Sequence, residues 1–200
     1  MDGLAVFLDR DGVLNRPVIK EGKSFPPASP GEFEILPGVQ EACRQLKQAG
    51  FVLIVATNQP DVARGSQSLE TVESMHQILR SQLPLDDIRT CYHDDQDRCG
   101  CRKPQPGLLL EAAGQWHINL HQSFMVGDRW KDIEAGRRAG CRTVFIDWNY
   151  NERLLNPPDA KFSSLLEAAA WICRNRAAAE DAASSANGRK KSTKKMETHL

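Results

Sequence analysis

Residues 4–12 read LAVFLDRDG, a short apolar run that stops at two acids and a glycine. Three later segments have the same form, in which an apolar run is followed by polar or glycine-containing residues. They are FVLIVATNQP (51–60), SFMVGDR (123–129) and RTVFID (142–147). Apolar runs without strict alternation, bounded by turn residues, are typical of parallel strands that are covered on both faces.

Segments with apolar residues at helical spacing lie between these runs. One extends from Val39 to Ala49 and is followed by Gly50, a residue that commonly ends helices. Strands that alternate with helices predict an α/β fold with a doubly wound parallel sheet, in which ligands bind at the carboxyl ends of the strands. Further helices are predicted over Glu70–Leu83, Pro106–Gln115 and Lys131–Ala139.

The composition predicts a soluble globular chain with a single core, since 40% of its 200 residues are hydrophobic and 26% are charged. No apolar run approaches the roughly 20 residues that a membrane span needs. The N-terminus has an acid at Asp2 and no basic region, which is unlike a secretory signal, so a cytoplasmic location is expected. The 26 Lys and Arg residues balance the 26 Asp and Glu residues, and this indicates neither a nucleic acid nor a membrane as partner.

The last part of the chain differs in composition from the rest. Residues 177–200 read AAAEDAASSANGRKKSTKKMETHL and contain almost no large apolar side chains. Such a segment buries too little surface to offset the entropy of ordering, so a disordered tail is predicted after one folded domain at 1–176. Its basic run could contact a polyanion, although a solvated terminus is the simpler interpretation.

The ends of the predicted strands carry groups that suit phosphate and a divalent cation. Asp9 and Asp11 lie two residues apart after a strand, where both carboxylates can point the same way. Such a pair favours either a cation site or a nucleophile beside an acid/base, and an ordinary solvated turn is the alternative. Thr57, Lys103 and Asp128 add a hydroxyl, a cation and a third acid, and the whole set fits phosphoryl transfer assisted by Mg²⁺.

Four segments, in this order, resemble the motifs of the haloacid dehalogenase (HAD) superfamily of phosphohydrolases: FLDRDGVLN, VATNQ, CRKP and MVGDRWKDIEAG. The resemblance implies a HAD-like Rossmannoid core. It also implies that Asp9 is the nucleophile that forms an aspartyl-phosphate, and that Asp11 is the general acid and then the general base. No insert after Gly12 is long enough for a large cap domain, so an open site with specificity in its loops is expected.

The same resemblance implies roles for the other motif residues. Thr57 and Lys103 would hold the phosphoryl oxygens. Asp128 would complete the Mg²⁺ site together with Asp9 and the main chain of Asp11. Asp132 would be a supporting carboxylate, although at the start of a helix it could simply complement the helix dipole.

A cysteine-rich loop at residues 91–101 predicts a second metal site. Cys91, His93, Cys99 and Cys101 supply four ligands, the number that a closed tetrahedral Zn²⁺ site needs. With no open position for water or substrate, this zinc would be structural and would present the following residues to the phosphate crevice. The alternative is a set of reduced cysteines that are close by chance. Cys43, Cys141 and Cys173 lie in apolar patterns and are predicted to be core residues.

The zinc loop is similar to that of the HAD branch that holds D-glycero-D-manno-heptose-1,7-bisphosphate 7-phosphatases and histidinol-phosphate phosphatases. Arg102-Lys103 and the segment TNQPDVARG (57–65) are more similar to the heptose group. The resemblance implies that Arg102 contacts the second phosphate or the sugar and that Arg129 lies beside the substrate. The candidate substrate-binding residues are therefore Asn58, Gln59, Arg64, Arg102, Lys103 and Arg129.

Two segments depart from this branch and could line the substrate entrance. Pro60-Asp61 stands where Ser-Gly is frequent, and residues 20–30 are long and rich in proline. The expected activity is Mg²⁺-dependent hydrolysis of the 7-phosphate of heptose 1,7-bisphosphate by a monomer. Histidinol phosphate or another small phosphomonoester is the alternative substrate. A nucleic-acid 3′-phosphatase is disfavoured by the neutral charge, and a non-catalytic zinc-stabilised binding protein by the intact set of motif residues.

Overall fold

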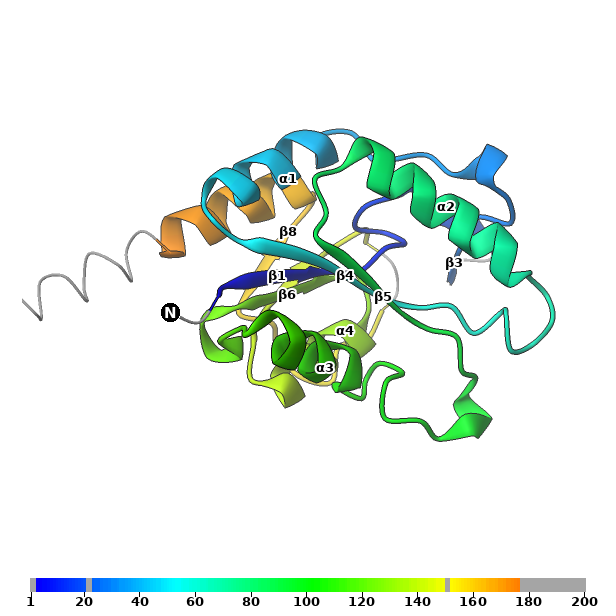
Figure 1. Cartoon of the computed structure of the whole chain (residues 1–200). Coiled ribbons are helices and arrows are strands. Elements are labelled where there is room, and N and C mark those ends of the chain that lie inside the picture. The colour runs from blue at the N-terminus through cyan, green and yellow to red at the C-terminus, as the bar shows by residue number, and fades with distance from the viewer. Residues whose placement is uncertain (1–2, 21–22, 150–151, 177–200) are drawn as a thin grey trace, which may run out of the picture.

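The computed structural model describes residues 3–20, 23–149 and 152–176, and a parallel six-stranded sheet forms its middle layer (Figure 1). The strand order is β5-β4-β1-β6-β7-β8. All five neighbouring pairs are parallel, as the buried apolar runs of the sequence predicted. The strands are β1 (Ala5–Leu8), β4 (Val52–Asn58), β5 (Asp87–Cys91), β6 (Phe124–Gly127), β7 (Arg142–Ile146) and β8 (Ala160–Phe162).

Helices cover both faces of the sheet, which confirms the doubly wound architecture. One face packs against α1 (Val39–Gln48), α2 (Leu69–Gln82) and a helical segment at 165–176, and the other packs against α3 (Gly107–Trp116) and α4 (Trp130–Ala139). The central strand β1 serves both cores because its side chains alternate between the faces. Val6 and Leu8 belong to the first core, and Ala5 and Phe7 to the second.

The strand order reverses at β1, which places a crevice at the carboxyl ends of the central strands. The chain passes from β1 to β4 on one side and later returns to β6 on the other side. Asp9 directly follows β1, Thr57 is the next-to-last residue of β4, and Asp128 directly follows β6. The predicted convergence of these polar residues therefore results from the topology of the sheet.

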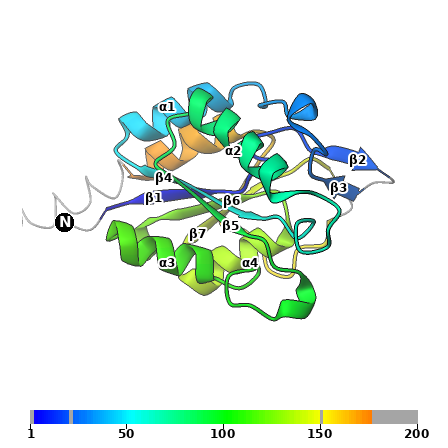
Figure 2. The same cartoon turned by 45° about the vertical axis from the view of Figure 1, so that its right-hand side comes forward.

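Some elements were not predicted from the sequence. Strand β5 reads DIRTC, which lacks an apolar run, and the short strand β8 and the helix at 165–176 were not foreseen. The segment after Gly12 forms only a small antiparallel pair, β2 (Val18–Lys20) and β3 (Lys23–Phe25), beyond the carboxyl ends of the central strands (Figure 2). This pair is far too small to be a cap domain. Three 3₁₀ turns complete the described elements: η1 (Pro30–Glu32), η2 (Asp95–Asp97) and η3 (Leu120–Gln122).

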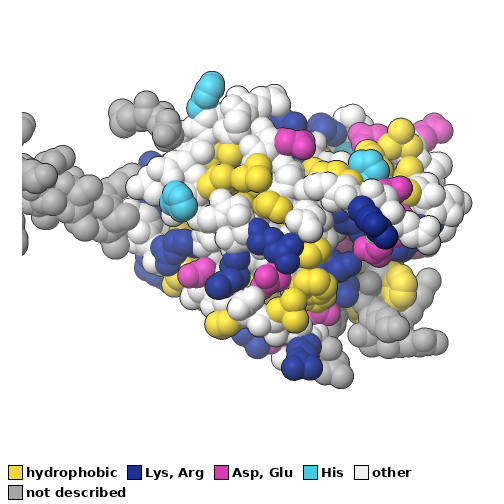
Figure 3. Space-filling model, turned by 90° about the horizontal axis from the view of Figure 1, so that it is seen from below, with side chains coloured by type: hydrophobic (Ala, Val, Ile, Leu, Met, Phe, Trp, Pro, Cys, Tyr) yellow, Lys and Arg dark blue, Asp and Glu magenta, His cyan; other side chains and the backbone are white. Residues whose placement is uncertain are grey.

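Acidic and basic side chains are interspersed on the face that α3 and α4 cover (Figure 3). Nothing on this face resembles the continuous basic surface that tracks a nucleic-acid backbone. None of the described helices is long and apolar enough to span a membrane. The predicted tail at 177–200 lies outside the described residues.

Candidate active site

Three carboxylates meet at the carboxyl ends of β1 and β6. One oxygen from each of Asp9, Asp128 and Asp132 lies within 4.8 Å of the others, and all three side chains are buried. Glycines make this approach possible, because a Cβ atom at Gly12 would lie 2.2 Å from Oδ2 of Asp128 and one at Gly127 would lie 2.1 Å from the Cβ of Asp132. The carboxylate of Asp132 therefore belongs to this cluster of three, and the carboxylate of Asp11 does not.

The negative charge of these three carboxylates favours the binding of a cation. Burial and the neighbouring Asp132 raise the pKa of Asp9 to about 7, although Lys103 acts in the opposite direction. Burial, together with Asp9 and Asp132, also raises the pKa of Asp128 well above its usual value. Both carboxylate oxygens of Asp128 are buried and have no hydrogen-bond partner among the described residues. Since Mg²⁺ takes oxygen ligands from a few carboxylates, these residues fit a Mg²⁺ ion.

Lys103 supplies the positive charge within the cluster. Its Nζ lies 2.5 Å from Oδ1 of Asp132 and 2.7 Å from Oδ1 of Asp9, and only 2% of the side chain is exposed. Burial alone would lower the pKa of Lys103, but the two carboxylates outweigh it and raise that pKa. Asn58 fixes the position of the lysine, because its side chain accepts a hydrogen bond from the Lys103 N–H and donates one to the Lys103 carbonyl, both 3.0 Å long.

Asp11 lies apart from the three carboxylates, in a network of donors. The guanidinium of Arg10 is fully buried and donates to both Asp11 oxygens over 3.2 Å. Asn15 and Gln59 each donate another hydrogen bond of 2.9 Å to the same carboxylate. Gln59 also donates to the hydroxyl of Thr57. The network holds Asp11 facing the cavity. Asn58 and Gln59 were predicted to bind substrate, and in this structure the side chains of both have protein partners.

Above these buried groups lies an open cavity of about 350 Å³. Besides Lys103, four cations line it: Arg64, Arg102, Arg129 and Lys131. The two segments expected at the substrate entrance line it as well, one through Pro60-Asp61 and the other through Phe25, the last residue of β3, and Pro26. The cavity therefore has an acidic floor with one lysine and a basic rim. All the predicted catalytic and substrate-binding residues line it except Gln59.

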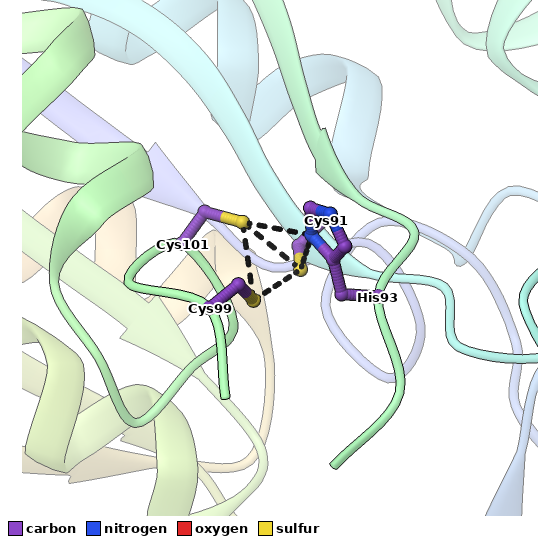
Figure 4. A group of neighbouring side chains, drawn as sticks. All are labelled: Cys91, His93, Cys99 and Cys101. Carbon is purple, nitrogen blue, oxygen red and sulfur yellow. Dashed lines mark hydrogen bonds between the residues drawn. The ribbon is translucent and has the colours of Figure 1, made fainter. Parts of the chain in front are cut away.

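The four predicted zinc ligands also come together. Cys91 ends β5, and the side chains of Cys91, His93, Cys99 and Cys101 point toward one another (Figure 4). The three Sγ–Sγ distances are 3.2, 3.4 and 3.7 Å, and Nδ1 of His93 lies 3.3 Å from Cys101 and 3.6 Å from Cys91. Ligands at about 2.0–2.3 Å from zinc in a tetrahedron are separated by roughly 3.3–3.8 Å, so the cluster is compatible with Zn²⁺.

The other three cysteines lie in the core, as predicted. Cys43 and Cys141 are buried, and Cys173 is partly buried against the core that contains α1. Burial raises the pKa of the Cys43 thiol and that of the Cys141 thiol to about 12, which keeps both neutral. All six cysteines are free thiols.

Comparison with known proteins places this site in a family. Residues 100–168 match the HAD-hydrolase-like family. The chain is 38% identical over 148 residues to the D-glycero-beta-D-manno-heptose-1,7-bisphosphate 7-phosphatase of Helicobacter pylori strain 26695, over 71% of this chain and 82% of that protein. It is 34% identical over 174 residues to the phosphatase of the same name from Pseudomonas putida, over 84% and 97% of the two chains. The chain belongs to the heptose-bisphosphate phosphatase family.

A solved structure of this family has the same fold. It is the D,D-heptose 1.7-bisphosphate phosphatase from B. bronchiseptica complexed with magnesium and phosphate, with a TM-score of 0.75 and 28% identity. The match covers 86% of this chain and 99% of that one.

Some site residues of this heptose-bisphosphate phosphatase family member were not predicted from the sequence. Arg10 and Asn15 lie within the first motif. The position of Arg10 between two acids, directly after a buried strand, could have indicated its role. Asp95 and Lys131 also line the cavity. Lys131 lies within the fourth motif and Asp95 within the cysteine-rich loop, but neither was predicted to reach the substrate. Only the fold brings them to the rim.

Proposed function

We propose that this chain is a Mg²⁺-dependent phosphatase that hydrolyses the 7-phosphate of D-glycero-D-manno-heptose 1,7-bisphosphate. The observation that carries the proposal is the convergence of Asp9, Asp128, Asp132 and Lys103 on one buried floor, with Asp11 facing the same cavity. The substrate is inferred from the relatives, which are named as heptose-1,7-bisphosphate 7-phosphatases.

In the first step, an Asp9 oxygen attacks the phosphorus of the 7-phosphate. The bond from phosphorus to the sugar oxygen breaks, and the leaving oxygen takes a proton from Asp11. Lys103 and the hydroxyl of Thr57 stabilise the charge on the phosphoryl oxygens. Arg10, Asn15 and Gln59 position the carboxyl group of Asp11 through the hydrogen bonds that they donate to it.

In the second step, Asp11 removes a proton from water, and the resulting nucleophile attacks the phosphorus of the aspartyl-phosphate. The bond from phosphorus to Asp9 breaks, which releases phosphate and restores the carboxylate. Asp9, Asp128 and the main chain of Asp11 would hold Mg²⁺, and Asp132 would support the lysine and the metal ligands. When bound, the ion neutralises charge on the phosphoryl group.

The proposal includes a structural zinc and a monomer in the cytoplasm. The cluster of free thiols suits a reducing compartment. The zinc ligands precede Arg102 and Lys103 directly, so a bound ion would fix the loop that carries both side chains.

The test is a comparison of Mg²⁺-dependent phosphate release from heptose 1,7-bisphosphate and from histidinol phosphate, side by side. We expect a strong preference for the heptose, with loss of the 7-phosphate and retention of the anomeric phosphate in the phosphorus NMR spectrum. A preference for histidinol phosphate, or equally slow turnover of both, would leave only the phosphatase class. Salt-sensitive binding of DNA would favour the nucleic-acid alternative.

A further inference from the structure

The lining of the cavity separates charge by depth. Its floor holds four carboxylates, those of Asp9, Asp11, Asp128 and Asp132, against the single cation Lys103. Its rim holds four cations against two carboxylates, those of Asp61 and Asp95. The floor therefore attracts a metal cation, whereas the rim attracts an anion at some distance from the reacting phosphate.

The three arginines of the rim already have carboxylate partners within the chain. Arg64 forms two hydrogen bonds with Asp94, of 2.7 and 2.9 Å. Arg102 donates to both oxygens of Asp95, over 2.8 and 3.3 Å. These two bidentate pairs set the orientation of the Arg64 and Arg102 guanidinium groups in this structure. The third, Arg129, lies 3.1 Å from a carboxylate oxygen of Glu152.

Lys131 is paired more weakly than these arginines. Its Nζ lies 3.9 Å from Oδ1 of Asp95, at the long limit of an ion pair. A third of its side chain is exposed, and the residue lines the cavity. The Asp95 carboxylate is shared, because Arg102 binds both of its oxygens and Arg64 lies 3.5 Å from it. Burial lowers the pKa of Lys131, and the facing charges of Arg102, Arg129 and Arg64 lower it further, against the effect of Asp95.

One carboxylate therefore serves three cations. Asp95 lies in η2 on the zinc loop, and 64% of its side chain is exposed, so it can move away from the rim. A phosphate carries more charge and more acceptor oxygens than a carboxylate. A phosphate group at the rim would bind Lys131 more strongly than Asp95 does.

We propose that Lys131 binds a second anionic group of the substrate, distal to the reacting phosphate, and that Asp95 occupies this position until the substrate displaces it. The inference rests on the proposed function and names the residues that distinguish a bisphosphate from a monophosphate. Lys131 determines specificity through direct contact, and Asp95 sets the affinity by competing for the same cation.

The experiment uses the Mg²⁺- and zinc-loaded enzyme with two substrates that differ only in the distal group, heptose 1,7-bisphosphate and heptose 7-phosphate. Lys131→Met should raise KM for the bisphosphate about ten-fold, the loss of one charge-assisted hydrogen bond, and leave KM for the monophosphate unchanged. Asp95→Asn should lower KM for the bisphosphate alone. Lys161→Met is the matched control, because Lys161 pairs with Asp147 and neither residue lines the cavity.

Two results would overturn the inference. One is an equal rise in both KM values in Lys131→Met, which would indicate a general effect on the site. The other is a higher bisphosphate KM in Asp95→Asn, which would mean that Asp95 positions Arg102 instead of competing with the substrate. If neither heptose phosphate is turned over, the proposed function fails by itself. Calorimetric binding of the same two ligands then tests the role of Lys131. An unmutated protein that binds the bisphosphate no more tightly than the monophosphate contradicts that role.

Discussion

The Nζ atom of Lys103 lies 2.7 Å from Oδ1 of Asp9 and ties the loop that follows the zinc cluster to the end of β1. The same ammonium contacts Asp132 at the start of α4. Because a buried ion pair that loses one partner leaves an uncompensated charge, the second carboxylate is important for the stability of the site. Lys103 remains paired with Asp132 when Asp9 is neutralised.

Asp9→Asn should abolish Mg²⁺-dependent phosphate release and leave the protein folded. The amide keeps the size of the carboxyl group but is not nucleophilic, and Asp132 still neutralises Lys103. Circular dichroism, a zinc assay and a phosphate-release assay on the same sample check this prediction. We expect an unchanged spectrum, one equivalent of zinc and no turnover. Turnover that survives the substitution would refute the assignment of Asp9 as the nucleophile.

Gly12→Ala should inactivate the enzyme by displacing the Asp128 carboxylate. Gly12 has φ +88°, and its Cβ would lie 2.2 Å from Oδ2 of Asp128. Gly65→Ala is the matched control, because Gly65 has φ +70° but nothing within 4 Å of the added Cβ. Both variants should lose roughly 1–2 kcal/mol of stability from the left-handed backbone. Only Gly12→Ala should also lose kcat and Mg²⁺ affinity, and equal kcat values in the two variants would contradict this mechanism.

The sequence predicted the central part of the fold because local and tertiary preferences agree there. Each of the four apolar runs forms a parallel strand of the sheet, since a strand that is buried on both faces needs continuous apolar residues. Strand β5 lies at the edge of the sheet, and four of its five residues are only half-buried. Its sequence DIRTC therefore carries no pattern that distinguishes a strand from a loop.

The candidate site was predictable where a motif lies at a strand end. The positions of Asp9, Thr57 and Asp128 follow from the sheet topology, and the spacing of the cysteines predicted their clustering. The partners of these groups depend on packing between elements that are distant in sequence. The full burial of Arg10 and the arrangement of Asp95 beside Lys131 are of this kind, and no sequence pattern encodes them.

The stability of the protein should fall as the pH decreases below about 6.5, partly because of His76. This histidine is fully buried between Arg10 and Glu73. Burial lowers its pKa, Arg10 and Arg80 lower it further, and Glu73 only partly opposes them. The unfolded chain therefore binds a proton at a higher pH than the folded one, so that acid favours unfolding. Stability from His76 is present above its unfolded pKa and is lost as the pH falls toward its folded pKa.

Urea denaturation of the unmutated protein and of His76→Gln measures this contribution. Between about pH 7.5 and pH 5.5, the unmutated protein should lose more stability than the variant. Release of zinc by acid affects both proteins equally and cancels in the comparison. Parallel pH profiles for the two proteins would mean that His76 takes up its proton as readily in the folded state as in the unfolded state.

Removal of zinc should weaken substrate binding and leave the core of the enzyme folded. The cluster closes the loop at 91–101, which carries Asp95 and leads into Arg102 and Lys103. Without the ion, the four side chains lose the atom that joins them, and the polar loop is held mainly by exposed ion pairs such as that of Arg64 with Asp94. Cys99→Ser should therefore bind less than one equivalent of zinc and show a raised KM.

The control for this variant is Cys173→Ser, which alters a partly buried thiol of the core outside the cluster. It should retain the zinc and the KM of the unmutated enzyme, because Cys173 lies against α1 and not beside the cavity. Chelation of the unmutated enzyme should reproduce the behaviour of Cys99→Ser, and added zinc should reverse it. A chelated enzyme that stays fully active would rule out the structural role, since Arg102 and Lys103 would then keep their positions without the metal.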